Sequence, residues 1–267
     1  MEKIGLIAGN RKFPFLVSLA AKKRGYQIIA VAIKGDTSPA LKRSVDKIYW
    51  IGLADFRRMF QIFKDEGITN VIMAGQISPR RLFSKEINKD EELKSLLATI
   101  KNKKPDSIFG AIAGKLKESG LILMDSTAFI KDYLPKKGTL TKLEPSSSVW
   151  EDVCFGLDLA KAVANLDIGQ TVAVKERAVV AVEAFEGTDN LIRRAGRLAR
   201  GGIVVVKVSK PKQDLRFDVP VVGLNTVKNL IKASAKCLAI EAEMTLFIDR
   251  QVSISLADKH KLAIVAV

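Results

Sequence analysis

An alternation of short apolar runs with amphipathic segments constrains the fold of this chain more than any other feature. The runs "KIGLIAG", "QIIAVAI" and "NVIMAG" lie in the first third, and the segment "LADFRRMFQIFKDEG" between two of them has helical periodicity and ends at Gly67. Strands that are apolar on both faces are buried on both faces. This pattern therefore predicts a parallel sheet with helices on each side.

The remainder of the chain predicts a second domain of a different kind. The stretch "YLPKKGTLTKLEPSSS" has two prolines and no apolar period, which indicates a linker over residues 133–148. Beyond it we expect a long helix, a hairpin turning at Glu176–Arg177, a helix over 226–237 and a strand "EMTLFID". The predicted fold class is thus α/β, with a Rossmann-like N-terminal domain over 1–132 and a mixed α/β domain over 149–267.

Composition restricts the partners and the compartment. The chain has a net charge of +15, which favours an anionic partner such as a phosphorylated ligand, a nucleic acid or an anionic membrane surface. Aromatic residues make up 6% and do not alternate with basic ones, which argues against stacking on single-stranded nucleic acid. No signal peptide or membrane-spanning run is evident, and the two cysteines lack CxxC spacing, so we expect a cytoplasmic protein with structural thiols.

Two loops of the first domain have the composition of a ligand site. In an open α/β sheet, ligands bind outside the carboxyl ends of the strands, where helix amides also bind phosphate. The candidate residues are Gly9, Asn10 and Lys12 in "GLIAGNRKFP", and Gly75, Gln76, Arg80 and Arg81 in "AGQISPRR". Neither loop has the GxGxxG spacing of a dinucleotide site, so the sequence favours another nucleotide-containing ligand, with simple turn punctuation as the alternative.

The second domain has a denser group of charged residues. "AVEAFEGTDNLIRR" brings Glu183, Glu186, Thr188 and Asp189 to one strand end, with Arg193 one helical turn later. Either Thr188 or Asp189 is suited to cap the helix. "VKVSKPKQDLRFDVPVVGLNTV" follows another strand, so we expect the two segments to meet at one edge of the same sheet.

Facing carboxylates suit Mg²⁺, and neighbouring lysines and arginines suit a pyrophosphate, which together indicate phosphoryl transfer. A structural network of ion pairs is the alternative. The single histidine, His260, lies in a polar stretch and is expected at the surface.

These motifs resemble the UDP-2,3-diacylglucosamine pyrophosphatases of the LpxI type, which act in lipid A biosynthesis. The resemblance extends over nearly the whole chain and is carried by "GLIAGN", "AGQISPR", "LDIGQTVAVKE", "AVEAFEGTD" and "KPKQDLRFDVPVVGLNT". In the first loop, Asn10 and Arg11 stand where the family more often has small residues.

The resemblance implies a two-domain enzyme that holds its lipid substrate in a chamber between the domains. The substrate would be hydrolysed to UMP and 2,3-diacylglucosamine 1-phosphate with Mg²⁺ as the cofactor. Asp218, in the RxDxP portion of the last motif, would be the catalytic residue, with Asp189 and Asp218 as metal ligands. The implied substrate-binding residues are Gly9, Asn10, Lys12, Gly75, Gln76, Gln170, Thr188, Arg193, Lys210, Lys212 and Arg216. Asp214 would pair with one of the cations.

An anionic lipid substrate also suits a basic protein that associates peripherally with the inner membrane and binds no nucleic acid. Two other functions are compatible with parts of the sequence. A nucleotide-sugar oxidoreductase would use a similar first domain but needs a cofactor fingerprint, and a nucleic-acid-binding protein would also account for the charge. The phosphorus attacked, the acyl-chain lengths, the position of the acyl chamber and the oligomeric state are left open by the sequence.

Overall fold

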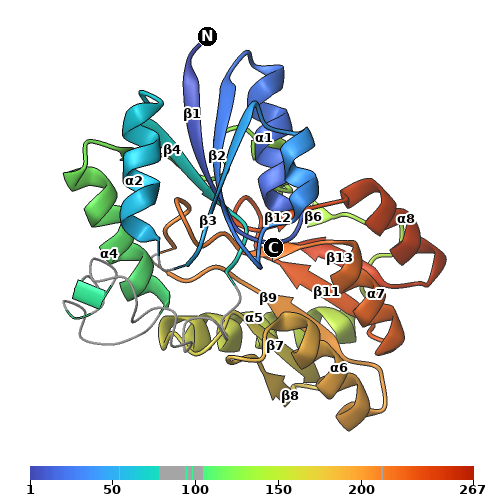
Figure 1. Cartoon of the computed structure of the whole chain (residues 1–267). Coiled ribbons are helices and arrows are strands. Elements are labelled where there is room, and N and C mark those ends of the chain that lie inside the picture. The colour runs from blue at the N-terminus through green and yellow to red at the C-terminus, as the bar shows by residue number, and fades with distance from the viewer. Residues whose placement is uncertain (54, 78–93, 96–97, 99–104, 212) are drawn as a thin grey trace. The chain divides into compact units, whose positions relative to one another are not determined.

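The computed structural model describes residues 1–53, 55–77, 94–95, 98, 105–211 and 213–267 (Figure 1). The chain divides into two compact units. Unit 1 comprises Met1–Lys131 together with Asp214–Asp218, and unit 2 comprises Asp132–Gln213 and Val219–Val267. Unit 1 is therefore built from two separate parts of the sequence, which differs from the contiguous N-terminal domain predicted over 1–132.

The described part of unit 1 forms a five-stranded parallel sheet in the order β3-β2-β1-β4-β5. Its strands are β1 Lys3–Ala8, β2 Gln27–Ile33, β3 Lys47–Ile51, β4 Asn70–Ala74 and β5 Ile122–Leu123. The strand order reverses at β1, since the chain moves from β1 to one side and later returns to its other side as β4. Such a reversal leaves a crevice at the carboxyl ends of the two strands, where α/β proteins bind ligands.

Helices cover both faces of this sheet, as the apolar runs predicted. The helices are α1 Phe13–Lys23, α2 Phe56–Asp65 and α4 Pro105–Glu118, with the 3-10 helix η1 Pro39–Arg43. α1 lies on one face, and α2 and α4 lie on the other (Figure 1). On the α2 side, Phe63 and Leu116 are fully buried against Ile29 and Val71 of the sheet. The partly buried ring of Phe217, from the distant segment Asp214–Asp218, packs on the same cluster.

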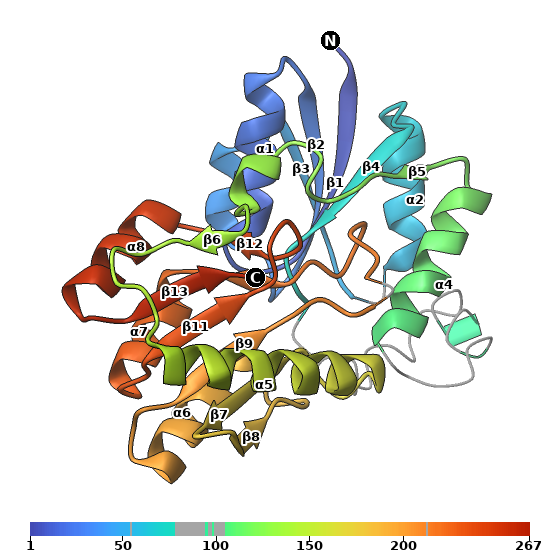
Figure 2. The same cartoon turned by 180° about the vertical axis from the view of Figure 1, so that it is seen from behind.

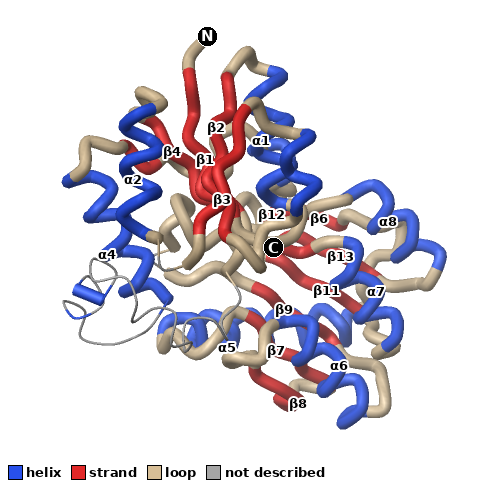
Figure 3. The backbone as a smooth tube through the Cα atoms, viewed as in Figure 1, coloured by secondary structure: helices blue, strands red, loops and turns tan. Residues whose placement is uncertain are grey.

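Unit 2 contains a six-stranded mixed sheet in the order β6-β13-β11-β9-β7-β8 and a pair of short parallel strands, β10 and β12 (Figure 3). The strands are β6 Gly138–Thr139, β7 Thr171–Lys175, β8 Ala178–Val182, β9 Val204–Lys207, β10 Val221–Val222, β11 Cys237–Ile240, β12 Leu246–Phe247 and β13 Ala263–Ala266. β9, β11 and β13 run parallel, whereas β6, β7 and β8 pair antiparallel with their neighbours.

The helices of unit 2 segregate to the two faces of its sheet. α5 Ser147–Asn165 lies along one face, where Val153 and Ala160 pack on the valines of β7 and β9 (Figure 2). The other face is covered by α6 Thr188–Ala199, α7 Leu224–Lys232 and α8 Arg250–Lys259. The α/β class is thus confirmed, with a parallel sheet in one unit and a mixed sheet in the other.

Several local predictions need correction. The helix expected over 226–237 ends at Lys232, and Cys237–Ile240 forms the buried strand β11 instead. The helix cannot continue through Ser234, because the φ of this residue is +49°. A buried run as short as "CLAI" has no periodicity that distinguishes a strand from a helix. Within the predicted linker 133–148, Gly138–Thr139 pairs with β13 as strand β6. The segment "DEELKSLLATIKNKK" over 90–104, whose periodicity also predicts a helix, lies largely outside the described residues.

The cysteines have different environments. Cys237 is fully buried in β11, and burial raises the pKa of its thiol to about 12, as expected of a structural residue. Cys154 on α5 is exposed, so burial does not support the expected structural role for this thiol. No helix among the described residues has the length and apolar character that a bilayer span requires.

Candidate functional site

The crevice of unit 1 is shaped by two glycines whose backbones touch. Gly9 follows β1 and donates its amide to Ala74 O at 2.8 Å, and Asn10 donates to Gln76 O at 2.8 Å. A Cβ on Gly9 would lie 2.8 Å from Gln76 N, and one on Gly75 would lie 2.5 Å from Asn10 O. Gly75 also has φ +86°, which disfavours other residues. The structure therefore brings four predicted residues together where the strand order reverses.

The polar groups of this crevice are oriented by the same loops. The side-chain oxygen of Asn10 is buried and accepts no hydrogen bond from the described part of the chain. A buried acceptor of this kind calls for an explanation, and a bound ligand is one. Lys12 precedes α1 as its N-cap residue, with Pro14 in the first turn. The positive end of α1 thus lies beside Gly9 and Asn10, in the arrangement that binds anions in other α/β proteins.

A turn from the second half of the sequence completes unit 1. Ser126 follows β5 and is 1% exposed; its amide donates to Leu215 O at 3.0 Å. Its hydroxyl lies 2.6 Å from both Met73 O, in β4, and Arg216 O. Together with the packing of the partly buried Phe217 ring, these contacts fix residues 214–218 against β4 and β5. The last part of the "KPKQDLRFD" loop therefore belongs to unit 1, and its expected meeting with the Glu183–Asp189 segment stays a prediction.

Within this turn, Asp214 and Arg216 bind each other. The Asp214 carboxylate accepts from Arg216 Nε at 2.9 Å, from Nη2 at 2.6 Å and from the Arg216 amide at 3.0 Å. The hydrogen bonds from the Arg216 guanidinium lower the pKa of the Asp214 carboxyl and outweigh its partial burial. The predicted role of Asp214 as partner of a cation is confirmed, and the Arg216 charge is already offset. Asp218 closes the turn by donating its amide to Asp214 O at 3.1 Å.

In unit 2, a buried network joins the ends of three strands and α6. Lys207, at the end of β9, donates to the Thr188 hydroxyl at 2.8 Å and points within 3.4 Å of the Thr171 hydroxyl. Thr188 donates in turn to Glu183 Oε1 at 2.9 Å, and Glu183 Oε2 accepts the Gln170 amide at 3.3 Å. Glu183 is 8% exposed and Lys207 is 7% exposed. The Thr188 proton is therefore directed at protein, so any contact of this hydroxyl with substrate is as an acceptor.

Lys207 was not among the residues selected from the sequence. Its signal is a single charged residue inside the apolar run "GIVVVKVS", where a lysine is out of place unless it has a specific partner. The expected cap of α6 was also wrong, because Gly187 is the N-cap residue and Thr188 is the first residue of the helix.

Other charged residues of unit 2 form ion pairs. Lys210 pairs with Asp167 at 2.7 Å, so part of its charge is already offset. Glu241 accepts from Lys161 at 2.7 Å and from the amide and hydroxyl of Ser209 at 2.6 Å each. Burial alone would raise the pKa of Glu241, but these hydrogen bonds outweigh burial and lower it. The alternative of a structural ion-pair network thus applies to Ser209 and Lys210 of this loop. Lys212 lies outside the described residues.

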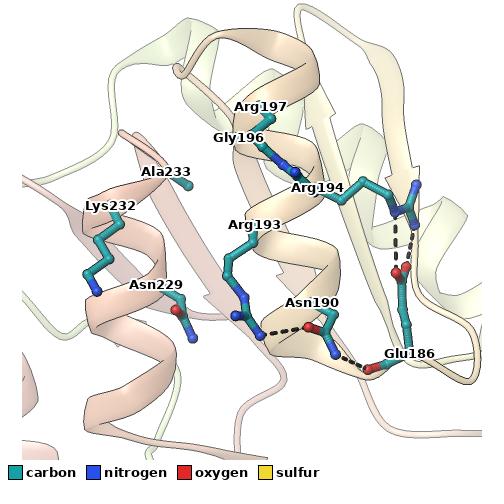
Figure 4. A pocket seen from close by; sticks show the side chains of 9 residues that line it. All are labelled: Glu186, Asn190, Arg193, Arg194, Gly196, Arg197, Asn229, Lys232 and Ala233. Atoms are coloured by element: carbon teal, nitrogen blue, oxygen red, sulfur yellow. Dashed lines mark hydrogen bonds and ion pairs between the residues drawn. The ribbon is translucent and has the colours of Figure 1, made fainter.

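Arg193 lines a groove on the outer side of α6 rather than the Lys207 network (Figure 4). Its guanidinium donates to Asn190 Oδ1 at 2.6 Å and to the Asp189 carbonyl at 3.2 Å, while Arg194 pairs with Glu186. The groove has a volume of about 670 Å³ and runs between α6 and α7. It is lined by Glu186, Asn190, Arg193, Arg194, Gly196, Arg197, Asn229, Lys232 and Ala233.

The two predicted metal ligands belong to different units. Asp218 belongs to unit 1, and Asp189 belongs to unit 2, where it accepts from Asn225 Nδ2 at 2.7 Å. The described residues hold no group of three or more His, Cys, Asp or Glu side chains placed to bind a metal ion. A closed protein cage for a metal is therefore absent from this part of the chain. Mg²⁺ commonly binds one or two carboxylates plus substrate phosphates, and a single aspartate fits that donor set only with substrate present.

These features define a two-unit α/β protein in which two glycine loops meet where the strand order of the parallel sheet reverses, and in which a buried Lys-Thr-Glu network lies at one end of the mixed sheet. Two domain families match it in succession, the LpxI N-terminal domain over residues 3–133 and the LpxI C-terminal domain over residues 136–265. The chain therefore belongs to the LpxI family.

A relative of known name matches over the full length. The chain is 29% identical over 277 residues to the UDP-2,3-diacylglucosamine pyrophosphatase LpxI of Caulobacter vibrioides. The alignment covers 100% of this chain and 98% of that protein.

Solved structures resemble it only distantly. The biotin carboxylase domain of Hydrogenobacter thermophilus 2-oxoglutarate carboxylase has 15% identity and a TM-score of 0.28, covering 74% of this chain and 41% of that one. N5-carboxyaminoimidazole ribonucleotide synthetase from Thermotoga maritima has 18% identity and a TM-score of 0.25, with 70% and 43% covered. TM-scores this low support no conclusion about fold or ligand.

Proposed function

We propose that this protein hydrolyses the pyrophosphate of UDP-2,3-diacylglucosamine in lipid A biosynthesis. Water adds to one of the two phosphorus atoms, the bond from that phosphorus to the bridging oxygen breaks, and the products are UMP and 2,3-diacylglucosamine 1-phosphate. The observation that carries the proposal is the match of both LpxI domains in order along the chain, together with the full-length relative that bears this activity in its name. Family membership favours this function over the oxidoreductase and nucleic-acid-binding alternatives.

In this proposal the crevice of unit 1 binds the nucleotide end of the substrate. Gly9 and Gly75 keep the loops low enough for a ligand to approach the backbone, and the N-terminus of α1 favours a phosphate. The buried Asn10 oxygen is an acceptor suited to a base N–H or a ribose hydroxyl. Gln76 and Lys12 would complete the contacts from the same two loops.

Asp218 is the proposed catalytic residue. The turn 214–218 holds it at the carboxyl edge of the unit 1 sheet through backbone bonds and the partly buried Phe217 ring. A carboxylate there accepts a proton from the attacking water and orients it, while Lys210, Lys212 and Arg216 offset phosphate charge. Lys210 and Arg216 act with their aspartate partners in place, so their contribution is smaller than that of unpaired cations.

Mg²⁺ is part of the proposal as a substrate-dependent ligand. Asp218 and Asp189 would each supply a carboxylate oxygen, with the remaining positions filled by the diphosphate and water. When bound, the ion neutralises phosphate charge and makes water more acidic. The proposed chamber between the two domains is supported by candidate residues that occur in both units.

Peripheral association with the inner membrane is also proposed. It is supported by the net charge of +15 and by the basic groove of α6 and α7, because anionic lipid headgroups attract such surfaces. We expect Arg197→Ser with Lys232→Ser to weaken sedimentation with vesicles rich in phosphatidylglycerol. The matched pair Lys42→Ser with Arg43→Ser, on η1 of unit 1, should not change it. Equal loss in both pairs would mean that net charge alone drives binding.

The test of the activity is direct. Purified protein is incubated with UDP-2,3-diacylglucosamine, with and without Mg²⁺, and phosphorus NMR follows the loss of the diphosphate and the appearance of UMP. Running the reaction in ¹⁸O-labelled water shows which phosphorus is attacked, because the label enters only that product. Intact substrate after long incubation with Mg²⁺ would refute the proposal.

A further inference from the structure

The most unusual side chain in unit 2 is Lys207, a nearly buried ammonium group. Only 7% of the residue is exposed, and its hydrogen-bond partners among the described residues are the hydroxyls of Thr188 and Thr171. Within the described ranges no acidic side chain forms an ion pair with it. A buried cation held only by neutral hydroxyls is costly unless a negative charge joins it.

Glu183 offsets part of this cost but does not occupy the lysine. Its carboxylate is reached through the Thr188 hydroxyl, which accepts from Lys207 and donates to Glu183. An ammonium group has three N–H donors, and the two threonines account for two of them. One of these contacts, at 3.4 Å to Thr171, is long. Lys207 therefore has donor capacity that the described residues do not fill.

The position of this group favours an anion. Thr188 is the first residue of α6, so the ammonium lies beside the N-terminal end of a 12-residue helix. The positive end of the helix dipole and the lysine charge add at this point. Two independent sources of positive potential thus converge at one edge of the mixed sheet.

We propose that Lys207 binds a phosphate group of the substrate diphosphate. The inference rests on the proposed pyrophosphatase activity and adds to it a residue that directly contacts the substrate. As the bridging P–O bond breaks, its electron pair stays with the departing phosphate, and an ammonium held in place by Thr188 offsets the added charge without rearrangement. The Thr188-Glu183 pair then serves to position Lys207 rather than to contact the reacting atoms.

The alternative is a purely structural lysine that ties β9 to α6. Lys207→Met distinguishes the phosphate-binding role from the structural role, since methionine has a similar length and no charge. The control is Lys175→Met, at the end of the neighbouring strand β7, because among the described residues Lys175 donates to the carbonyl of Ala199 alone, at 3.0 Å. Thr171, at the start of β7, lies opposite Lys207. Lys175 is the last residue of β7, so it lies at the opposite end of this strand.

The first measurement is titration calorimetry of the full-length protein with inorganic pyrophosphate at fixed Mg²⁺. Loss of one charged hydrogen bond should weaken binding by about 10- to 100-fold in Lys207→Met, and Lys175→Met should bind like wild type. Turnover of the lipid substrate should fall at least as much in Lys207→Met. A structural lysine would instead lower the melting temperature and leave pyrophosphate affinity unchanged, which would overturn the proposal.

A second measurement needs no substitution and covers the case in which Lys207→Met does not fold. In wild-type protein labelled with ¹⁵N-lysine, pyrophosphate should shift the Lys207 ammonium resonance and leave that of Lys175 in place. No shift at saturating pyrophosphate would overturn the proposal. If the lipid yields no UMP while the Lys207 resonance still responds, the proposed activity is wrong and the anion site stands.

Discussion

Replacing Asp218 by asparagine separates chemistry from stability at the candidate site. The side chain keeps its volume but loses its charge, so it can no longer accept a proton from water or bind a hard cation strongly. Other groups hold the turn that carries it: the Asp218 amide donates to Asp214 O, Ser126 donates to the carbonyls of Leu215 and Arg216, and the partly buried Phe217 ring packs against the core. We therefore expect the turn to stay folded, with a change in the free energy of unfolding of no more than about 1 kcal/mol, the range of a solvent-screened charge interaction.

Turnover should respond much more strongly. Removal of a positioned general base costs about 100-fold or more, which corresponds to roughly 2.7 kcal/mol in the activation free energy. Substrate binding should persist, because the basic residues stay and one negative charge is removed. The assay is the initial rate of UMP release together with a separate measurement of substrate affinity in the same variant.

Asp214→Asn is the matched control in the same turn. Asp214 and Arg216 have side chains 30% and 47% exposed, and solvent screening limits such a pair to about 0.2–1 kcal/mol. Asparagine also retains an oxygen for the Arg216 amide. We expect a small loss of stability and a rate within about tenfold of wild type. If Asp214→Asn abolished turnover and Asp218→Asn did not, the assignment of Asp218 as the catalytic residue would be refuted.

Three further outcomes are expected. Chelation should abolish turnover and leave the melting temperature nearly unchanged, because the described residues form no closed metal cage; a large drop on chelation would contradict this. Separately expressed segments 1–132 and 149–267 should each fail to bind the UDP-lipid tightly, and 1–132 should also be less stable than unit 1 because it lacks Phe217; full activity of 149–267 alone would contradict the two-domain site. The Glu241 pKa is lowered by folding, so the stability it contributes is complete above its ordinary value of 4.5 and is lost as pH falls below it. Melting temperatures measured from about pH 6 to pH 3 should therefore fall less steeply for Glu241→Gln than for wild type, and parallel curves would contradict this.

The fold was predictable where the sequence of a single strand or helix is enough to identify that element. The runs that became β1, β2 and β4 are long, apolar and bounded by turns, so they could be assigned without knowledge of their neighbours. β11 was missed because its four residues have no periodicity, and only their pairing with β9 and β13 identifies them as a strand.

The candidate site was predictable in part for a related reason. Gly9 and Gly75 follow strands whose ends must meet, so their proximity follows from the sheet. The turn 214–218 joins unit 1 through Ser126 and Phe217, and nothing in the sequence near Phe217 specifies a partner some 90 residues earlier. Lys207 was overlooked because its importance depends on burial, which a single charged residue in a strand does not reveal.

The discontinuity of unit 1 also bears on how the protein is made. The ribosome completes Met1–Lys131 first, but the segment that carries Phe217 follows only after most of the mixed sheet has been translated. At about 5–20 residues per second, this delay is roughly 4–17 s. During that time the nascent first unit has an apolar position that its own segment cannot fill, and it becomes complete only when residues 214–218 have left the exit tunnel. The second half of the chain thus supplies the last piece of the first, which couples the folding of the two units during synthesis.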